Sequence, residues 1–496
     1  MLRKKMLKLL CMTTVTTGLL VGTSIMSASA CTTVVAGKNA TVDGSTINAR
    51  NEDMSTAWTK RFIVHPHKVN KEGDMYISKA NGFTYPLPKE SFKYTATPEW
   101  DTSDGDFEEA GINEYEVAVS STESATANDK AQAADPLVEN GIDEDSVNSI
   151  ILPRVKTARE GVKLLGKIVE EKGATEAYGV IISDPNEVWY VETGSGHQWV
   201  AQRVPDDCYA VIPNILVIDK VNLEDTNNFM GSKNLIKFAE EKGLYDPKKD
   251  GEFSFKKAYG TDSKKDYKYN YPRTWLGQKI LSPSVKQEIG RNDYKLFMKP
   301  DKKISVEDVA KVLRAHYEGT EYDCYGKYKN EYRTINAEHT MESHILQCRS
   351  NLPKGVGGVH WIALGVPETS VYVPFYSGIT ETPKAYQIGT NTPDYKSAYW
   401  TYRRTGVLTK PYYHDYLGRI TKPILRAEEQ MITKKLYETD NYVAELYNKD
   451  PKAAEEYMTK YCDRIANYCI EKTQDLNKKL IKETTKKTNV NHNKDL

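Results

Sequence analysis

The sequence changes character abruptly at Cys31, and this change constrains the chain more than any other feature. A basic start is followed by an apolar run from Leu9 to Ile25, and Ala28 and Ala30 supply the small side chains that a signal peptidase needs before its cleavage site. The pattern predicts a signal peptide over residues 1–30 and a secreted protein, either free outside the cell or associated with the cell wall. Cleavage after Ala30 makes Cys31 the first residue, with a thiol and a free α-amine together.

A cysteine at the N-terminus combines a nucleophile with its own base. The thiolate is the reactive form, and the pKa of an unperturbed thiol is about 8.5. An α-amine titrates at about 7.7, so it can take the thiol proton and later return it to a leaving amine. Two other interpretations of the junction stay open. Cys31 can be exposed incidentally, or it can be the acylated first residue of a lipoprotein, although such sites usually have a large aliphatic residue where this chain has Ala28.

The residues after Cys31 predict a β-hairpin. A β-branched, apolar stretch is followed by turn residues between Lys38 and Gly44, and then by a second strand-like stretch that ends at Arg50. An antiparallel hairpin places residues near position 50 opposite the start of the first strand, so Arg50 and Asp53 should lie beside Cys31. A guanidinium near the sulfur favours the thiolate, and a carboxylate near the amine orients it. The alternative for both residues is an exposed ion pair at a strand end.

Motifs along the chain follow the order of one enzyme family. They are CTTVVAGK (residues 31–38), ARNED (49–53), EAGINE (109–114), ETGSGHQW (192–199), LRAHYEGT (313–320) and VYVPFY (371–376). By these motifs the chain, from Cys31 to about Arg426, resembles the secreted cysteine dipeptidases of the dipeptidase A type. These are N-terminal-nucleophile hydrolases related to choloylglycine hydrolase and penicillin V acylase.

The resemblance implies an α+β fold, a four-layer αββα sandwich, and hydrolysis of dipeptides without a metal or organic cofactor. Periodicity alone indicates only a mixture of helices and strands. In the related acylases an Asn near the position of Asn113 contributes to the oxyanion hole, and Asn214 resembles a second such Asn. One preorganised donor of this kind is typically worth about 3 kcal/mol. The alternative for Asn113 is a role in a turn. Arg349 is the nearest match to a second arginine that lies close to the thiol in the bile-salt relatives.

The predicted domain organisation has four parts. Residues 1–30 form the signal peptide, 31–426 the dipeptidase domain, 427–479 C-terminal helices and 480–496 a disordered, Lys-rich tail. Within the domain we expect a helix from about Asn148 to Gly173, an exposed insertion from Lys248 to Tyr271, and a capped helix that starts at Ser305. We expect that helix to run through Leu313 and His316. His316 and Glu318 within it could form an acid/base pair, but the α-amine already supplies a base, which favours a structural role.

Composition excludes several classes of protein. Removing residues 1–30 takes away four of the 68 Lys and Arg residues and none of the 68 Asp and Glu residues, so the mature chain is mildly acidic. It has no basic stripe for nucleic acid and no segment approaching the roughly 20 apolar residues of a membrane span. No Cys-x-x-Cys spacing occurs. His65 and His67 lack a third ligand nearby, and the acidic loop at 99–109 does not have the spacing of an EF-hand, so no metal site is expected.

The predicted function is therefore that of an exported cysteine dipeptidase, with Cys31, Arg50, Asp53, Asn113, Asn214 and Arg349 as its catalytic set. Its expected partners are dipeptide substrates and signal peptidase, and an oligomer is possible. One alternative is an amidase that acts on bile-salt or penicillin-type amides with the same residues. The other is a non-enzymatic lipoprotein acylated on Cys31.

Overall fold

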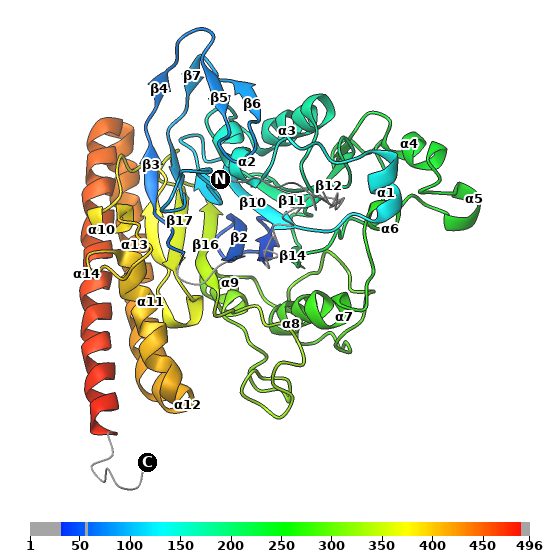
Figure 1. The fold of residues 1–496 in the computed structure, drawn as a ribbon. Helices are drawn as coiled ribbons and strands as arrows, with labels where there is room; N and C mark the ends of the chain where they lie inside the picture. Colours follow the sequence, from blue (N-terminus) through cyan, green and yellow to red (C-terminus); the bar gives the residue numbers. More distant parts are fainter. Residues whose placement is uncertain (1–30, 55–57, 488–496) are drawn as a thin grey trace, which may run out of the picture.

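The computed structural model describes residues 31–54 and 58–487, and two six-stranded antiparallel sheets form its centre (Figure 1). The predicted signal peptide and the last nine residues lie outside the described residues. The first sheet has the order β14 (Tyr209–Ile212), β1 (Thr32–Ala36), β2 (Thr46–Asp53), β16 (Thr340–Cys348), β17 (Gly358–Leu364) and β18 (Val373–Tyr376). The second has the order β15 (Phe229–Gly231), β13 (Trp199–Arg203), β12 (Val188–Thr193), β11 (Tyr178–Ser183), β10 (Ala118–Ser124) and β9 (Ala110–Ile112).

The predicted hairpin is present as β1 and β2. The two strands pair antiparallel with Thr32 opposite Asn51 and Thr33 opposite Arg50. Every residue of both strands is buried, because β14 and β16 flank the hairpin and the second sheet covers one face. Strands buried on both faces favour continuous β-branched and apolar residues, as in β1. Arg50, although charged, therefore lies inside the protein and not at its surface.

The two sheets face each other. β2 contacts β10, β11 and β12, and Asn48 of β2 donates a hydrogen bond to the carbonyl of Ile181 across the gap (3.3 Å). Thr46 reaches the carbonyl of Asp184 in the same way (2.7 Å). The interior between the sheets is thus partly polar, and it is into this layer that the side chain of Arg50 points.

Helices cover the outer face of each sheet. Helix α3 (Ala158–Lys172) packs on β11, β12 and β13. On the other side, α9 (Val306–Leu313), α11 (Ala398–Thr409), α13 (Lys422–Lys449) and α14 (Pro451–Lys486) cover the first sheet, with the two longest helices side by side (Figure 1). The predicted mixture of helices and strands with C-terminal helical additions is confirmed.

Shorter elements connect these layers. Three two-stranded ladders are formed by β3 (Ile63–His65) with β8 (Tyr94–Ala96), β4 (Lys68–Val69) with β7 (Glu90–Ser91), and β5 (Met75–Ile77) with β6 (Thr84–Pro86). The remaining helical elements are α1 (Asp129–Ala134), α2 (Glu144–Ile151), α4 (Leu235–Glu241), α5 (Pro247–Asp250), α6 (Phe255–Tyr259), α7 (Asp266–Tyr269), α8 (Tyr271–Leu281), η1 (Pro367–Thr369), α10 (Lys384–Gln387), η2 (Lys410–Tyr412), α12 (Tyr413–Tyr416) and η3 (Leu417–Thr421).

Two sequence-based boundaries are wrong. The single helix expected over 148–173 is two helices, α2 and α3, because Pro153 has no N–H to continue the first and Thr157 caps the second by accepting the N–H of Glu160 (3.2 Å). The tail expected to be disordered from Leu480 is helical to Lys486, because the fully buried side chain of Leu480 anchors the last turns of α14.

Two further predictions concern the middle of the chain. The stretch expected to be an exposed insertion, 248–271, contains Phe255 and Tyr259, which are fully buried in an apolar cluster with residues of both sheets. That expectation is therefore wrong for α6, whose aromatic side chains complete the core. The capped helix at Ser305 is confirmed as α9, with a capping box between Ser305 and Asp308. It ends at Leu313, so His316 lies after the helix and not within it as predicted.

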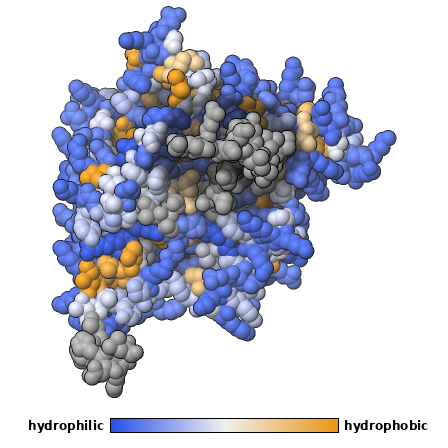
Figure 2. All heavy atoms as spheres, in the orientation of Figure 1, coloured by the Kyte–Doolittle hydropathy of each residue, from blue (hydrophilic) through white to orange (hydrophobic). Residues whose placement is uncertain are grey.

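The surface shown in Figure 2 is mostly hydrophilic, with small and separate apolar patches. Exposed apolar side chains include Val69 and Ile77 on the short ladders. In the part of the chain that the structure describes, no helix has both the length and the apolar character to cross a bilayer. The long helix α14 instead buries one face against α11 and α13 and leaves the other charged.

Glu192 is a fully buried carboxyl group on β12. Its two carboxyl oxygens accept the backbone N–H groups of Val217 (2.6 Å) and Ile218 (3.1 Å), which holds the chain that leaves β14. Burial outweighs these hydrogen bonds and raises the pKa of Glu192 to about 8. An unfolded Glu titrates at about 4.3. The folded protein therefore keeps a proton here over a pH range in which the unfolded chain has lost it.

We expect Glu192→Gln to remove a pH dependence of stability. Because the folded state binds the extra proton, the stabilisation of the folded state by protonated Glu192 is complete below about pH 4.3. This stabilisation is lost as the pH rises through about 8. From about pH 6 to about pH 8, the free energy of unfolding of the wild type should fall by about 2 kcal/mol relative to the variant, at about 1.4 kcal/mol per pKa unit. Urea unfolding of both proteins at these pH values measures the difference, and a constant difference would contradict the prediction.

Candidate active site

Cys31 lies at the start of β1 and its side chain is completely buried between the sheets. On the partner strand β2, Asn51 lies opposite Thr32, and Arg50 is the residue before Asn51. Arg50 donates from Nη1 to the Cys31 sulfur at 3.1 Å. The structure therefore brings together the predicted nucleophile and the predicted guanidinium. Their contact follows from the register of the β1–β2 hairpin.

The second sheet holds Arg50 in place. Its Nε donates to Ser120 Oγ (3.1 Å) and its Nη1 to the carbonyl of Thr122 (2.6 Å), both on β10. Its Nη2 forms an ion pair with Glu109, whose side chain is 2% exposed. Because a buried guanidinium without a counter-charge is very costly, Glu109 makes this position possible. Glu109 is the last residue of the acidic loop predicted at 99–109, and nothing in the sequence indicates its ion pair with Arg50.

The thiol of Cys31 is held in its neutral form in this environment. Burial is the main effect and raises the pKa of Cys31, while Arg50 acts in the opposite direction. The carboxylates of Glu123, Asp53 and Glu109 raise it further. A burial effect of this kind penalises the thiolate until another group supplies positive charge or takes the proton.

A second arginine near Cys31 comes from α8 and not from the predicted position. Arg273 donates from Nη1 to the backbone carbonyl of Cys31 (2.5 Å) and to Thr32 Oγ1 (2.9 Å). From Nη2 it donates to Asn214 Oδ1 (2.8 Å) and to Asn270 Oδ1 (2.6 Å). The sequence gives no local signal for this role, because α8 also contains Gln278 and the exposed Lys279, and nothing in the helix distinguishes a buried arginine from an exposed one.

Asn214 is therefore linked to the site through Arg273. It follows the end of β14, two residues after Ile212, which pairs with Thr33. Its amide oxygen is taken by Arg273, whereas its buried Nδ2 has no hydrogen-bond partner among the described residues. Asn214 thus keeps donor N–H groups next to the residues that surround Cys31, as a donor to a developing oxyanion requires.

Asp53 ends β2 and is also fully buried, so it is not an exposed ion pair. Its Oδ2 pairs with Nη2 of Arg333 (2.7 Å), and its Oδ1 accepts the hydroxyl of Thr340 (2.5 Å). Asp53 is one of the charges that raise the pKa of Cys31, so it belongs to the same charged cluster. Arg333 was not anticipated because 280 residues separate it from Asp53.

Asn113 stabilises a turn, which is the alternative to its predicted role in the oxyanion hole. Its Nδ2 donates to the carbonyls of Leu152 and Val155 (both 2.8 Å), and its Oδ1 accepts the N–H groups of Tyr115 and Val117 (both 3.0 Å). These bonds fix the turn between β9 and β10. Both donor hydrogens are in use, so an oxyanion role would break two buried hydrogen bonds.

Arg349 is not brought to Cys31. Arg349 directly follows β16, and His344 of β16 lies opposite Arg50. Arg349 is five residues beyond His344, which at about 3.3 Å per residue places it about 16 Å from the level of Arg50 along the strand. Its guanidinium forms an ion pair with Asp440 of α13 (2.5 Å) and donates to the carbonyls of Val356 and Gly357 (2.8 and 3.0 Å). Arg349 therefore links the C-terminal helix α13 to the first sheet.

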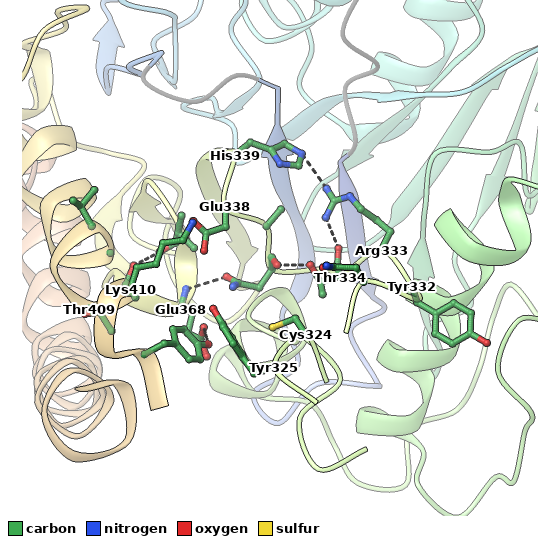
Figure 3. A pocket seen from close by; sticks show the side chains of 18 of the residues that line it. Cys324, Tyr325, Tyr332, Arg333, Thr334, Glu338, His339, Glu368, Thr409 and Lys410 are labelled. Atoms are coloured by element: carbon green, nitrogen blue, oxygen red, sulfur yellow. Dashed lines mark hydrogen bonds and ion pairs between the residues drawn. The ribbon is translucent and has the colours of Figure 1, made fainter. Parts of the chain in front are cut away.

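A cavity of about 1120 Å³ opens beside this cluster. Arg333 and His339 line it on one side, and Cys324, Tyr325 and Glu368 lie on another (Figure 3). Since Arg333 also pairs with Asp53, the cavity reaches the charged groups around Cys31. Its other charged residues carry both signs: Lys265, Lys268, Glu331, Glu338, Arg403 and Lys410. Such a lining suits a small ligand that carries charges of both signs.

Comparison with known proteins identifies the family. Residues 30–424 match Peptidase family C69. A probable dipeptidase of Latilactobacillus sakei is 41% identical over 462 residues, which cover 92% of this chain and 96% of that protein. A probable dipeptidase of Salmonella dublin is 44% identical over 71% of this chain and 81% of its own, and a probable dipeptidase B of Streptococcus pyogenes serotype M1 is 36% identical over 93% and 95%. The family expected from the motifs is confirmed: the chain is a peptidase and belongs to peptidase family C69.

Proposed function

We propose that this peptidase hydrolyses dipeptides through Cys31, after removal of residues 1–30 has made Cys31 the N-terminal residue. The observation that carries the proposal is the 3.1 Å contact between the Cys31 sulfur and Arg50 in a fully buried cluster of charges. The family match, which begins at residue 30, supports the same start. The arrangement of two facing sheets with outer helices supports assignment to the N-terminal-nucleophile hydrolases.

Before cleavage, the nitrogen of Cys31 is part of a peptide bond and cannot act as a base, and the raised pKa keeps the thiol neutral. After cleavage the α-amine takes the thiol proton, directly or through a water molecule. The sulfur attacks the peptide carbonyl, and the proton passes to the departing amine. Water then hydrolyses the thioester and regenerates the thiol.

The surrounding residues have separate roles in this sequence of steps. Arg50 stabilises the thiolate, and Asp53, already neutralised by Arg333, orients the α-amine. The unpartnered Nδ2 of Asn214 donates to the oxyanion, and Arg273 positions Asn214. The proposed catalytic set therefore keeps Cys31, Arg50, Asp53 and Asn214 from the sequence-based set.

Two observations support dipeptides as the substrate. The names of the relatives are those of probable dipeptidases. The cavity beside the site has cationic and anionic side chains, which suit the free amino and carboxyl groups that a dipeptide carries close together.

Export followed by mass analysis and substrate comparison tests the proposal. The full-length chain is produced in a host that exports it, and the purified product is examined by intact mass and N-terminal sequencing. We expect a chain that begins at an unmodified Cys31 and that cleaves dipeptides faster than conjugated bile salts or penicillin V. A chain that is active but starts at another residue, or that carries an acyl group, would contradict the proposed nucleophile. Faster cleavage of the bile-salt or penicillin amides would instead assign the same nucleophile to an amidase.

A further inference from the structure

A second group of reactive side chains surrounds His316, away from the Cys31 cluster. His316 follows α9 and is 5% exposed. Asp323 and Cys324 come from the loop that follows, and Cys324 also lines the large cavity, where Figure 3 shows it beside Tyr325. One ligand atom each of His316, Asp323 and Cys324 lies within 4.8 Å of the others. The proposed peptidase mechanism uses none of these three residues.

The two nitrogens of the His316 ring have different surroundings. Nε2 lies 3.0 Å from Glu368 Oε1 and 3.2 Å from the hydroxyl of Tyr413. A carboxylate at this distance favours a proton on Nε2, which leaves the lone pair on Nδ1. The buried Nδ1 has no hydrogen-bond partner in the described part of the chain, and Asp323 Oδ1 lies 3.5 Å from it. The ring therefore directs an unused lone pair toward Asp323 and Cys324.

We propose that His316, Asp323 and Cys324 form a binding site for one divalent transition-metal ion of the Zn²⁺ or Co²⁺ type. Imidazole nitrogen, carboxylate oxygen and thiolate sulfur are the ligands that these ions accept together. Bonds of about 2.0–2.3 Å place tetrahedral ligand atoms about 3.3–3.7 Å apart. The 3.5 Å between Nδ1 and Oδ1 already matches this spacing. The fourth position is left for water.

The residues around the site hold its ligands in position. The N–H of Cys324 donates to the carbonyl of His316 (3.3 Å), and the N–H of His316 donates to Glu318 Oε2 (2.8 Å). Glu368 fixes the ring through Nε2, as an outer carboxylate commonly does for a metal-bound histidine. Tyr325, the residue after Cys324, stacks on Tyr413 with ring centroids 3.8 Å apart. The metal would therefore join α9 to the loop that carries one wall of the cavity.

Charge favours a cation at this position. Glu318 Oε1 and Glu368 Oε1 lie 3.6 and 3.0 Å from Nε2, in addition to Asp323 near Nδ1. Three carboxylates therefore lie close to the two nitrogens of this ring, and their combined negative charge favours a bound cation over a neutral ligand.

Cobalt titration tests the site. The protein is purified as the full mature chain with Cys31→Ser, so that the N-terminal thiol and amine do not provide a competing sulfur ligand. We expect one Co²⁺ per chain, with the near-ultraviolet charge-transfer band of a cobalt–sulfur bond, and displacement of Co²⁺ by Zn²⁺. Adding Cys324→Ser should abolish the band. It should also weaken cobalt binding by at least about 100-fold, because loss of a residue that only hydrogen-bonds to a metal ligand already weakens metal binding by up to about 100-fold.

The chain offers a matched control. Cys208 also follows an aspartate, Asp207, but that aspartate pairs with Lys299 (2.6 Å). Cys208→Ser in the same background should keep the cobalt band and the affinity. A His316→Gln variant should lose the band as Cys324→Ser does, and circular dichroism checks that each variant is folded. Absence of stoichiometric cobalt binding, or a band that survives Cys324→Ser, would overturn the proposal, whatever the result for the peptidase activity.

Discussion

Replacing Cys31 with Ala should lower kcat/KM for dipeptides by at least about 10⁴-fold, because loss of a nucleophile removes the covalent route and leaves only binding and oxyanion stabilisation. The change removes a buried sulfur without adding a charge, so the fold should be retained. Hydrolysis rates of the exported variant and the wild type, each normalised to folded protein, measure the effect.

The control for this prediction is Cys208→Ser, in which a thiol outside the site is changed. Cys208 directly precedes β14, and its sulfur donates to Oδ1 of Asp207 (3.4 Å). This variant should keep wild-type rates. If Cys31→Ala hydrolyses dipeptides at an undiminished rate, Cys31 is not the nucleophile.

Replacing Arg50 with Met should produce the second large effect, on both catalysis and stability. The thiolate loses the guanidinium that lies 3.1 Å from the sulfur, and loss of one such preorganised donor typically costs about 10²–10³ in kcat. Glu109 is left buried without its partner, and breaking a buried ion pair typically costs about 3–5 kcal/mol. The rate of Cys31 alkylation by iodoacetamide, measured against pH, should shift to higher pH because the thiol pKa rises.

Arg349→Met is the matched control, because Arg349 is another buried arginine in an ion pair but lies away from Cys31. It should lose stability through Asp440 and keep both kcat/KM and the pH profile of alkylation. If Arg50→Met shows the same pattern as Arg349→Met, with stability lost and the alkylation profile unchanged, then Arg50 is structural and does not act on the thiol.

The hairpin explains why some of the site could be predicted from the sequence. Cys31, Arg50 and Asp53 lie on or directly beside the two strands of one hairpin, and antiparallel pairing of these strands is enough to bring their positions close together. Asn214 was identified by resemblance, although nothing local indicates that its Nδ2 is unpartnered. Helix α9 was predicted with its capping box because capping depends on residues three positions apart.

The errors have a common physical cause. Asn113 and Arg349 were assigned from short motifs, but a side chain's role depends on which donors and acceptors are left over after folding. Both residues use their polar groups on nearby carbonyls or on α13. Arg273 fills the position expected for a second arginine because α8 packs on β14, a contact between segments about 60 residues apart in the chain.

The amino-acid sequence alone was sufficient for the family, the mixed fold and the hairpin, because each depends on neighbouring residues or on the order of motifs. The tertiary structure decided which buried charges surround the thiol. Glu109 and Arg333 come from segments 59 and 280 residues away from the β2 residues that they neutralise. Contacts of this length are set by how sheets and helices pack, and no local pattern in a single sequence encodes them.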